Sequence, residues 1–208
     1  MTVPDIRELR SRLPAADPIA RFNSLLADAR AIDPALLPEP TAFALGTVST
    51  SGQPSVRMLL IKHADDDGFV FYTNFESRKG QELTATGKAA LCFHWQPLEV
   101  QVRVEGRVER VSDAESDSYF ATRARGSQIG AWASRQSQPI AAPGDLERRV
   151  AEFEAKFEGG PVPRPAHWGG FRLVPDAIEF WKNMPNRLHV RHRHTRTAAG
   201  WGVETLYP

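Results

Sequence analysis

Short apolar or alternating segments follow one another closely in the first half of the chain. The stretches 41–50, 55–64 and 68–74 are such segments, and the peptides 51–54 (SGQP) and 65–68 (DDDG) separate them. Separators of this length and composition are typical of hairpin turns. The run of aspartates in the second separator is interpreted as a solvated turn and not as a cation site. These segments therefore predict neighbouring antiparallel strands.

The rest of the chain continues the strand pattern and inserts helices into it. In the segment 99–111, Val100, Val102 and Val104 alternate with polar residues, which predicts a strand with one buried face. Further strands are expected over 88–96, 171–183, 187–196 and 200–208. Helices are expected from Pro18 after the cap Asp17, over 77–87, from the capping box of Ser112 and Glu115, and over 145–157.

This order of elements predicts a mainly β protein with inserted helices, built on an antiparallel barrel. We expect one domain over residues 17–208, preceded by a mobile N-terminal segment, 1–16. A parallel nucleotide-binding sheet is disfavoured, and the sequence contains neither a G-x-G-x-x-G motif nor a P-loop. A phosphate-bearing ligand would therefore have to be held by side chains.

The composition of the chain limits which classes of partner and which cellular compartment we expect. The 208 residues include 26 basic and 25 acidic side chains, and the net charge of +1 gives no general attraction to nucleic acid or to membranes. The single cysteine, Cys92, excludes an internal disulfide and suits a reducing cytosol. Because the chain has neither a hydrophobic signal core nor a membrane-length apolar run, we expect a cytoplasmic protein.

Two groups of cations are candidate anion sites. Arg57 and Lys62 flank a run of apolar residues, lie five apart and so face opposite sides of a strand. An unpaired charge near a buried surface is costly, so Arg57 is expected to have an anionic partner. Ser77, Arg78 and Lys79 open a helix, where the dipole already favours a phosphate. The alternatives are edge cations on a core strand and an ordinary basic helix start.

A third candidate lies around residue 120. Tyr119 and Arg123 are spaced i and i+4 on one expected helical face, with Ser127 just beyond. The following stretch, 126–138, lies between two helical segments and surrounds Trp132 with amides and hydroxyls. We interpret this stretch as the wall of a ligand site.

The C-terminal strands supply the fourth group. Arg187, His189 and Arg191 are expected on one strand face close to Trp181. His192 and His194 lie on the other face and are interpreted as a wet surface, because no carboxylate or cysteine accompanies them as a metal ligand. No metal site, catalytic triad or acidic pair is expected. The four groups together favour a phosphorylated aromatic cofactor and a phosphorylated small substrate, with the chemistry supplied by the cofactor.

Six peptides carry a resemblance that extends from about residue 17 to residue 208. They are SVRMLLIK, GFVFYTNFESRKGQEL, QVRVEGRVE, SYFATRARGSQIGAWASRQSQ, PVPRPAHWGG and EFW followed by NRLHVR. In this order they resemble the pyridoxamine 5'-phosphate oxidase family. The resemblance implies an FMN-binding split β-barrel and a homodimer with two active sites at the subunit interface. It also implies oxidation of pyridoxamine or pyridoxine 5'-phosphate by O2.

The resemblance also implies roles for individual residues. Those expected at FMN are Arg57, Met58, Leu59, Leu60, Ile61, Lys62, Tyr72, Thr73, Ser77, Arg78, Lys79, Gln101, Gln136, Ser137, Trp181 and Arg191. Gln101, Gln136 and Ser137 are expected to reach it from across the dimer, together with Trp181 and Arg191. Those expected at the substrate are Lys62, Tyr119, Arg123, Ser127, Arg187 and His189, and the last two are the candidate catalytic residues.

The sequence departs from the family pattern at several positions. Leu9 stands where the family has a lid tyrosine, Asn183 where it has glycine, Val190 where it has aspartate and Val100 where a basic residue is common. Two alternative functions therefore remain open at this stage. One is oxidation of another substrate, such as a phenazine precursor, and the other is binding of flavin or pyridoxal phosphate without turnover.

Overall fold

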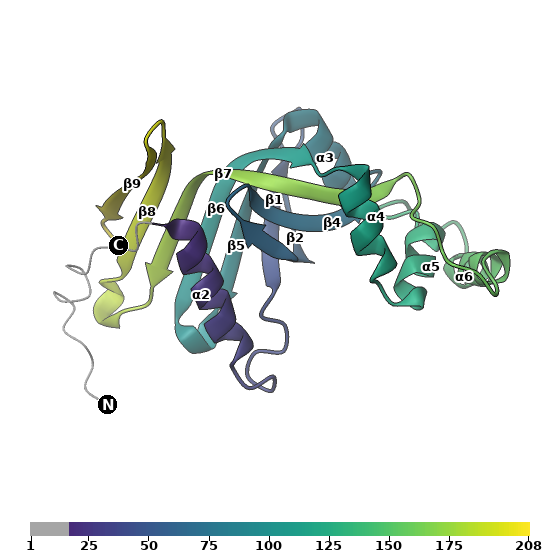
Figure 1. The fold of residues 1–208 in the computed structure, drawn as a ribbon, viewed down its shortest axis with the longest axis horizontal. Helices are drawn as coiled ribbons and strands as arrows, with labels where there is room; N and C mark the ends of the chain where they lie inside the picture. The colour runs from purple at the N-terminus through teal and green to yellow at the C-terminus, as the bar shows by residue number, and fades with distance from the viewer. Residues whose placement is uncertain (1–16) are drawn as a thin grey trace.

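The structure, a computed structural model, describes residues 17–208 (Figure 1). The segment 1–16, expected to be mobile, and Leu9 within it lie outside the described residues. The strands are β1 (Ala42–Val48), β2 (Pro54–Leu60), β3 (His63–Asp65), β4 (Gly68–Asn74), β5 (Lys88–Trp95), β6 (Val100–Arg110), β7 (Trp168–Lys182), β8 (Val190–Thr197) and β9 (Gly200–Leu206). The α-helices are α2 (Pro18–Arg30), α3 (Arg78–Thr86), α4 (Asp113–Ala121), α5 (Arg125–Ala133) and α6 (Asp145–Lys156). Short 3-10 turns follow β5 (η1, Gln96–Leu98) and β7 (η2, Pro185–Arg187).

All strand pairs are antiparallel, as the hairpin signals predict. The main path runs β2-β1-β5-β6-β7-β4-β3, and β8 and β9 extend the sheet from β7. The long strand β7 pairs with β4 along its first half and with β8 along its second half. The sheet therefore divides at β7, which gives the partly open barrel expected from the sequence.

A bulge in β7 changes which residues face the core. Glu105 is paired with Ala177, whereas Gly106 is paired with Pro175, so Asp176 has no partner in the register and is exposed. A β-carbon at Gly106 would lie only 2.1 Å from the carbonyl oxygen of Val174. Glycine is thus required where the two backbones approach each other, and the bulge reverses the side-chain alternation of β7 beyond that point.

The core is an aromatic cluster between the curved sheet and helix α2, which crosses the sheet (Figure 1). Phe22 of α2 is fully buried, and its ring lies 4.8 Å from that of Phe69 and 4.9 Å from that of Phe93. The helix begins where the sequence predicts, because Asp17 accepts hydrogen bonds from the backbone N–H groups of Ile19 and Ala20. This packing fixes α2 against the strands β4 and β5, and Phe43 of β1 joins the same cluster.

Helices α4, α5 and α6 gather at the opposite end of β7 from β8 and β9 (Figure 1). They enclose a second, smaller apolar cluster that includes Phe120, Ile129 and Trp168. Ser112 caps α4 by accepting from the backbone N–H of Glu115, as expected. Helix α5 was not expected: the stretch 126–138 was interpreted as lying between helices, but its first half is helical. No helix within residues 17–208 is long and apolar enough to cross a membrane.

Candidate active site

A cavity of about 680 Å³ opens between the strands β2 and β4 and the helices α4 and α5. Its size is that of a small-molecule site. The residues that line it are Met58, Leu59, Leu60, Lys62, Tyr72, Thr73, Asn74, Lys79, Tyr119, Arg123, Ala124, Ser127, Gly130, Ala131, Ser134, Gln136 and Trp168. It therefore brings together eleven residues that the sequence assigned to the cofactor or the substrate, from four separate segments of the chain.

Three stacked rings form one side of the cavity. The ring centroids of Tyr72 and Tyr119 lie 4.0 Å apart, and that of Trp168 lies 5.5 Å from Tyr72 and 6.2 Å from Tyr119. Burial, together with the nearby carboxylate of Glu115, raises the pKa of Tyr72 to about 12, so this hydroxyl stays protonated. The ammonium group of Lys62 lies 5.6 Å from the Tyr119 ring. The stack is a rigid apolar wall with a cation at its edge.

Arg123 brings a partly buried positive charge to the same wall. Its guanidinium lies 4.5 Å from the Trp168 ring centroid, and its Nη1 is buried with no hydrogen-bond partner among residues 17–208. Burial lowers the pKa of this guanidinium, although it stays charged. Helix α4 ends at Ala121, so Arg123 does not share a helical face with Tyr119 as expected, yet both line the cavity. An unpaired buried N–H of this kind calls for an anionic ligand.

The start of α3 forms the second polar region of the cavity. Ser77 caps the helix, and Lys79 Nζ donates to Gln136 Oε1 at 2.7 Å and to Ser77 Oγ at 3.2 Å. Burial, and secondarily the charge of Arg57, lowers the pKa of Lys79 to about 8. A second anion placed here would relieve the cost of burying this ammonium group.

Gln136 and Ser137 differ from the sequence expectation, which placed them across a dimer. Ser137 Oγ accepts from the backbone N–H of Arg78 at 3.2 Å, and Gln136 bonds Lys79 of the same chain. The reason is that α5 ends at Ala133, after which the chain turns back toward the start of α3. Ser137 adopts a positive φ of 73° in this turn.

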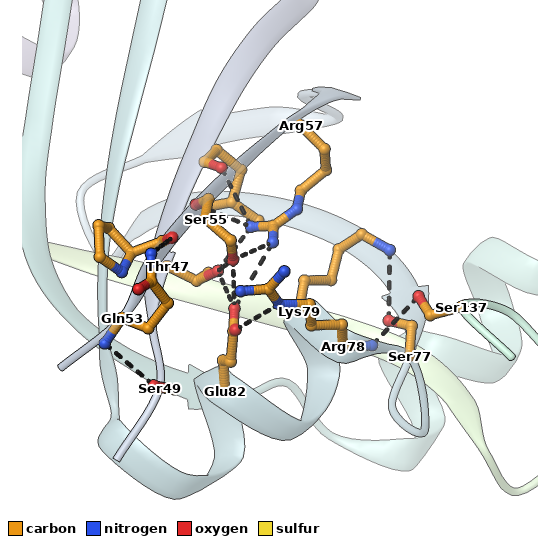
Figure 2. Close-up of polar contacts among 12 residues, drawn as sticks. Thr47, Ser49, Gln53, Ser55, Arg57, Ser77, Arg78, Lys79, Glu82 and Ser137 are labelled. Carbon is orange, nitrogen blue, oxygen red and sulfur yellow. Dashed lines mark hydrogen bonds and ion pairs between the residues drawn. The ribbon is translucent and has the colours of Figure 1, made fainter. Parts of the chain in front are cut away.

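Arg57 has the anionic partner that the sequence predicts, and that partner is Glu82 of α3. Arg57 Nη2 lies 3.5 Å from Glu82 Oε2, and Arg78 Nε donates to Glu82 Oε1 at 2.9 Å (Figure 2). Sequence reasoning did not single out Glu82, because a glutamate on a short polar helix is usually solvated. The available signal was its i+4 spacing from Arg78.

The remaining predicted residues form a second group at the far end of β7. Gln101 of β6 is paired with Trp181 of β7, and Trp181 with Arg191 of β8. The ring of His189 lies 4.5 Å from that of Trp181. Arg187 is not on a strand, as was expected: it lies in η2 with a positive φ of 59° and is exposed.

His189 is oriented by the backbone and not by a neighbouring acid. Its Nδ1 accepts from the backbone N–H of Met184 at 3.2 Å, which leaves the hydrogen of the neutral ring on Nε2. Val190, which replaces the family aspartate, is buried. Asn183 bonds Glu99 through both its backbone N–H and its side chain, so the turn that carries His189 is anchored.

The expectation for His192 and His194 was wrong. Both are buried, with 4% and 1% of their surface exposed, and His194 packs edge-on against Phe180 at 5.5 Å. Burial, and secondarily the charges of Arg21 and His194, lowers the pKa of His192. Arg21 of α2 lies over the neighbouring Phe180 ring at 4.2 Å and its charge acts on His192, a contact that strand alternation alone could not reveal. Within residues 17–208 there is no group of three potential metal ligands.

The predicted site is therefore divided between the two ends of one strand. Trp168 lines the cavity at the start of β7, and Trp181 lies near its end. At about 3.3 Å per residue, roughly 40 Å of strand separates them. In Figure 1, accordingly, α4 and α5 lie at one end of the molecule and η2 and β8 at the other. The two groups do not meet within one chain.

Comparisons with known proteins agree with this architecture. Residues 33–157 match the family model described as pyridoxamine 5'-phosphate oxidase, and residues 168–208 match the pyridoxine 5'-phosphate oxidase C-terminal dimerisation region. The chain is 58% identical over 192 residues to a pyridoxine/pyridoxamine 5'-phosphate oxidase of Myxococcus xanthus, covering 92% of each chain.

Two solved structures share the fold. PhzG from Burkholderia lata 383, solved in complex with tetrahydrophenazine-1-carboxylic acid, is 31% identical with a TM-score of 0.86, covering 100% of this chain and 98% of that one. A pyridoxamine 5'-phosphate oxidase-related, FMN binding protein from Nostoc punctiforme is 16% identical with a TM-score of 0.71, covering 92% and 98%, and bears on the fold alone. The chain belongs to the pyridoxamine 5'-phosphate oxidase family of FMN-dependent enzymes.

Proposed function

We propose that this enzyme oxidises pyridoxamine 5'-phosphate and pyridoxine 5'-phosphate to pyridoxal 5'-phosphate. In the alcohol, the C4' carbon loses two electrons and two protons, and O2 accepts them to form hydrogen peroxide. The amine passes through an imine, whose hydrolysis consumes water and releases ammonia. The reaction thus needs sites for two phosphorylated aromatic molecules in contact with each other.

The observation that carries this proposal is the set of side chains that line the cavity. It is lined by Lys79 at the start of α3 with its partner Gln136, and by Lys62, Arg123 and Ser127 beside the aromatic wall. Two separate cationic regions in one cavity suit two phosphates, and the flat apolar wall suits an aromatic ring. Fixed cations of this kind orient a substrate so that its reacting carbon is held close to the cofactor.

The residues at the start of α3 fit FMN. Lys79 is buried with a lowered pKa, and the helix start and the neighbouring Arg57 and Arg78 add positive charge for a phosphate. Met58, Leu59 and Leu60 of β2 offer an apolar surface for the ring system. When bound, FMN supplies the two-electron acceptor, which O2 regenerates.

We further propose a homodimer in which each active site takes residues from both subunits. Arg187 and His189, the candidate catalytic residues, belong to the group at the far end of β7 and would reach the cavity of the second copy. Val56 and Met58 of the edge strand β2 are 71% and 63% exposed, beside the mouth of the cavity. Such an apolar edge is the kind of surface that a second copy covers.

The function is tested by turnover of the FMN-loaded protein in air. With pyridoxine 5'-phosphate, pyridoxal 5'-phosphate and hydrogen peroxide are expected in equal amounts. The amine substrate is expected to give ammonia as well. Bound FMN with no product from either substrate would contradict the proposal and favour a non-catalytic binder. Turnover of a dihydrophenazine carboxylate alone would instead favour the activity suggested by the likeness to PhzG.

FMN affinity is expected to fall as the pH rises through about 8. The pKa of Lys79 is about 8 in the protein without cofactor, and a bound phosphate raises it, so the complex holds more protons than the free protein. Affinity should therefore decrease by up to about tenfold per pH unit above that value. Titration of the cofactor-free protein with FMN at several pH values between about pH 7 and pH 9.5 measures the dissociation constant and its dependence on pH.

The Lys79→Arg variant is the control for this titration, because its guanidinium stays charged over the whole range. Its FMN affinity is expected to be nearly independent of pH there. The same fall in both proteins would show that another group is responsible.

A further inference from the structure

The carboxylate of Glu82 lies at the centre of a polar network at helix α3 (Figure 2). Lys79 of the same helix lines the cavity. Its Oε1 accepts from Arg78 Nε, and its Oε2 accepts from the hydroxyls of Ser55, at 2.7 Å, and Thr47. The same Oε2 forms the ion pair with Arg57. The side chain is only 7% exposed. Glu82 thus contacts two of the arginines expected at FMN, Arg57 and Arg78.

The hydroxyls of Thr47 and Ser55 bridge Glu82 and Arg57 through hydrogen bonds. Thr47 of β1 and Ser55 of β2 face each other in the strand register. Arg57 Nη1 donates to Thr47 Oγ1 and Nη2 donates to Ser55 Oγ, both at 2.6 Å. Because each hydroxyl accepts from Arg57, its single hydrogen is available for Glu82. An ionised Glu82 therefore fixes the direction of both hydroxyls and, through them, the plane of the guanidinium.

Glu82 also balances the charge of the region. Burial raises its pKa, but hydrogen bonds from Thr47, Ser55 and Arg78 outweigh burial and hold the pKa at about 2. The carboxylate and the three cations Arg57, Arg78 and Lys79 leave a formal charge of +2. A phosphate monoester carries about −1.5 to −2 at pH 7, which matches this charge.

The network leaves donors for a ligand. Glu82 engages Arg78 through Nε, and within the described part of the chain the terminal nitrogens of Arg78 have no protein acceptor. That side chain is 56% exposed. Glu82 therefore holds the arginine without using the N–H groups that an arriving anion would need.

We propose that Glu82 is a positioning residue that prearranges Arg57 and Arg78 for the flavin phosphate. This inference rests on FMN occupying the cavity as proposed above. Without the carboxylate, the two guanidinium groups repel each other and their side chains gain rotational freedom. A phosphate would then have to order them on binding, at a cost in affinity.

The test compares FMN with riboflavin, which lacks the phosphate, in the Glu82→Gln variant. The dissociation constants of both flavins are measured by fluorescence quenching on cofactor-free protein. We expect FMN to bind about tenfold more weakly, as for the loss of one charge-assisted contact, and riboflavin to bind unchanged. Glu76→Gln is the matched control: Glu76 is exposed on the turn before α3, and its loss changes the charge equally without touching either arginine.

Each other outcome has a defined meaning. Equal weakening of both flavins would show that Glu82 only supports the fold. Unchanged FMN binding would show that Glu82 does not prearrange the arginines, and tighter FMN binding would show that its carboxylate competes with the phosphate. Each of these results overturns the inference. If the unmodified protein itself does not prefer FMN to riboflavin, the proposed cofactor site fails instead. Should the Gln variant not fold, Ser55→Ala removes one of the two hydroxyls, and the same selective loss is expected at a smaller size.

Discussion

Mixing two inactive variants, Arg123→Ala and Arg187→Ala, is expected to restore about a quarter of the unmodified activity. Each variant alone should lose at least about 100-fold, because each removes a charge that we propose contacts the substrate. In a dimer with shared sites, a mixed pair has one site with both changes and one with neither. Random pairing makes half of the dimers mixed, each with one intact site. Co-expression with two different tags, followed by turnover on the purified mixture, measures this.

The control pairs two changes from the same end of β7. Arg123→Ala mixed with Lys62→Ala, which also removes a cation from the cavity, should recover nothing, because every site of a mixed dimer then carries one of the two changes. Absence of recovery in the first mixture, with mixed dimers demonstrated by the tags, would contradict the shared site. It would require Arg187 to act on the cavity of its own chain.

Replacing Gly80 by alanine is expected to release FMN and to destabilise the protein. A β-carbon at this position of α3 would lie 2.4 Å from the carbonyl oxygen of Phe75 and 2.5 Å from that of Asn74. Backbone atoms cannot yield as a flexible side chain can, so the start of α3 must move, and Arg78 and Lys79 move with it. Overpacking of this kind costs about 1–3 kcal/mol, which lowers Tm by several degrees in a chain of this size.

Gly126→Ala is the matched control for this change. Gly126 is also in a short helix, α5, but a β-carbon there meets nothing within 4 Å. Alanine is the better helix former by up to about 1 kcal/mol, so Tm is expected to stay or to rise slightly. Thermal unfolding and FMN titration of both variants test the contrast. Tight FMN binding by Gly80→Ala would show that the proposed FMN site at the start of α3 tolerates movement of this helix.

Local signals were sufficient for most elements of the fold. Hairpin separators, the alternation in β6 and the caps Asp17 and Ser112 depend only on residues close in sequence, and the structure confirms each of them. Helix α5 was missed because glycines and polar residues give it little helix propensity, and its burial against α6 stabilises it instead.

The errors within the site have a common physical cause. The burial of His192 and His194 and the partnership of Glu82 with Arg57 depend on contacts between distant segments. The left-handed backbone of Arg187 interrupts the strand that the alternating pattern predicts. Strand alternation assigns a face but cannot say what covers it. The family resemblance assigned eleven residues of the cavity, and residue types and spacing had already singled out Lys62, Lys79 and Arg123 among them. Only the three-dimensional structure reveals that the group around Trp181 and His189 lies at the other end of β7.

The extra residue Asp176 has a geometric consequence for assembly. Before it, Phe171 and Leu173 point into the main core, and after it Ile178 and Phe180 do, so the inward positions change from odd to even. Trp168 and Trp181, although thirteen positions apart, consequently project from the same outer side of the ribbon. In the dimer proposed above, a twofold-related copy laid along that side would meet both ends in a single encounter, so one docking event would complete a pair of catalytic centres. Deleting this one residue would turn one end of the strand away from the partner.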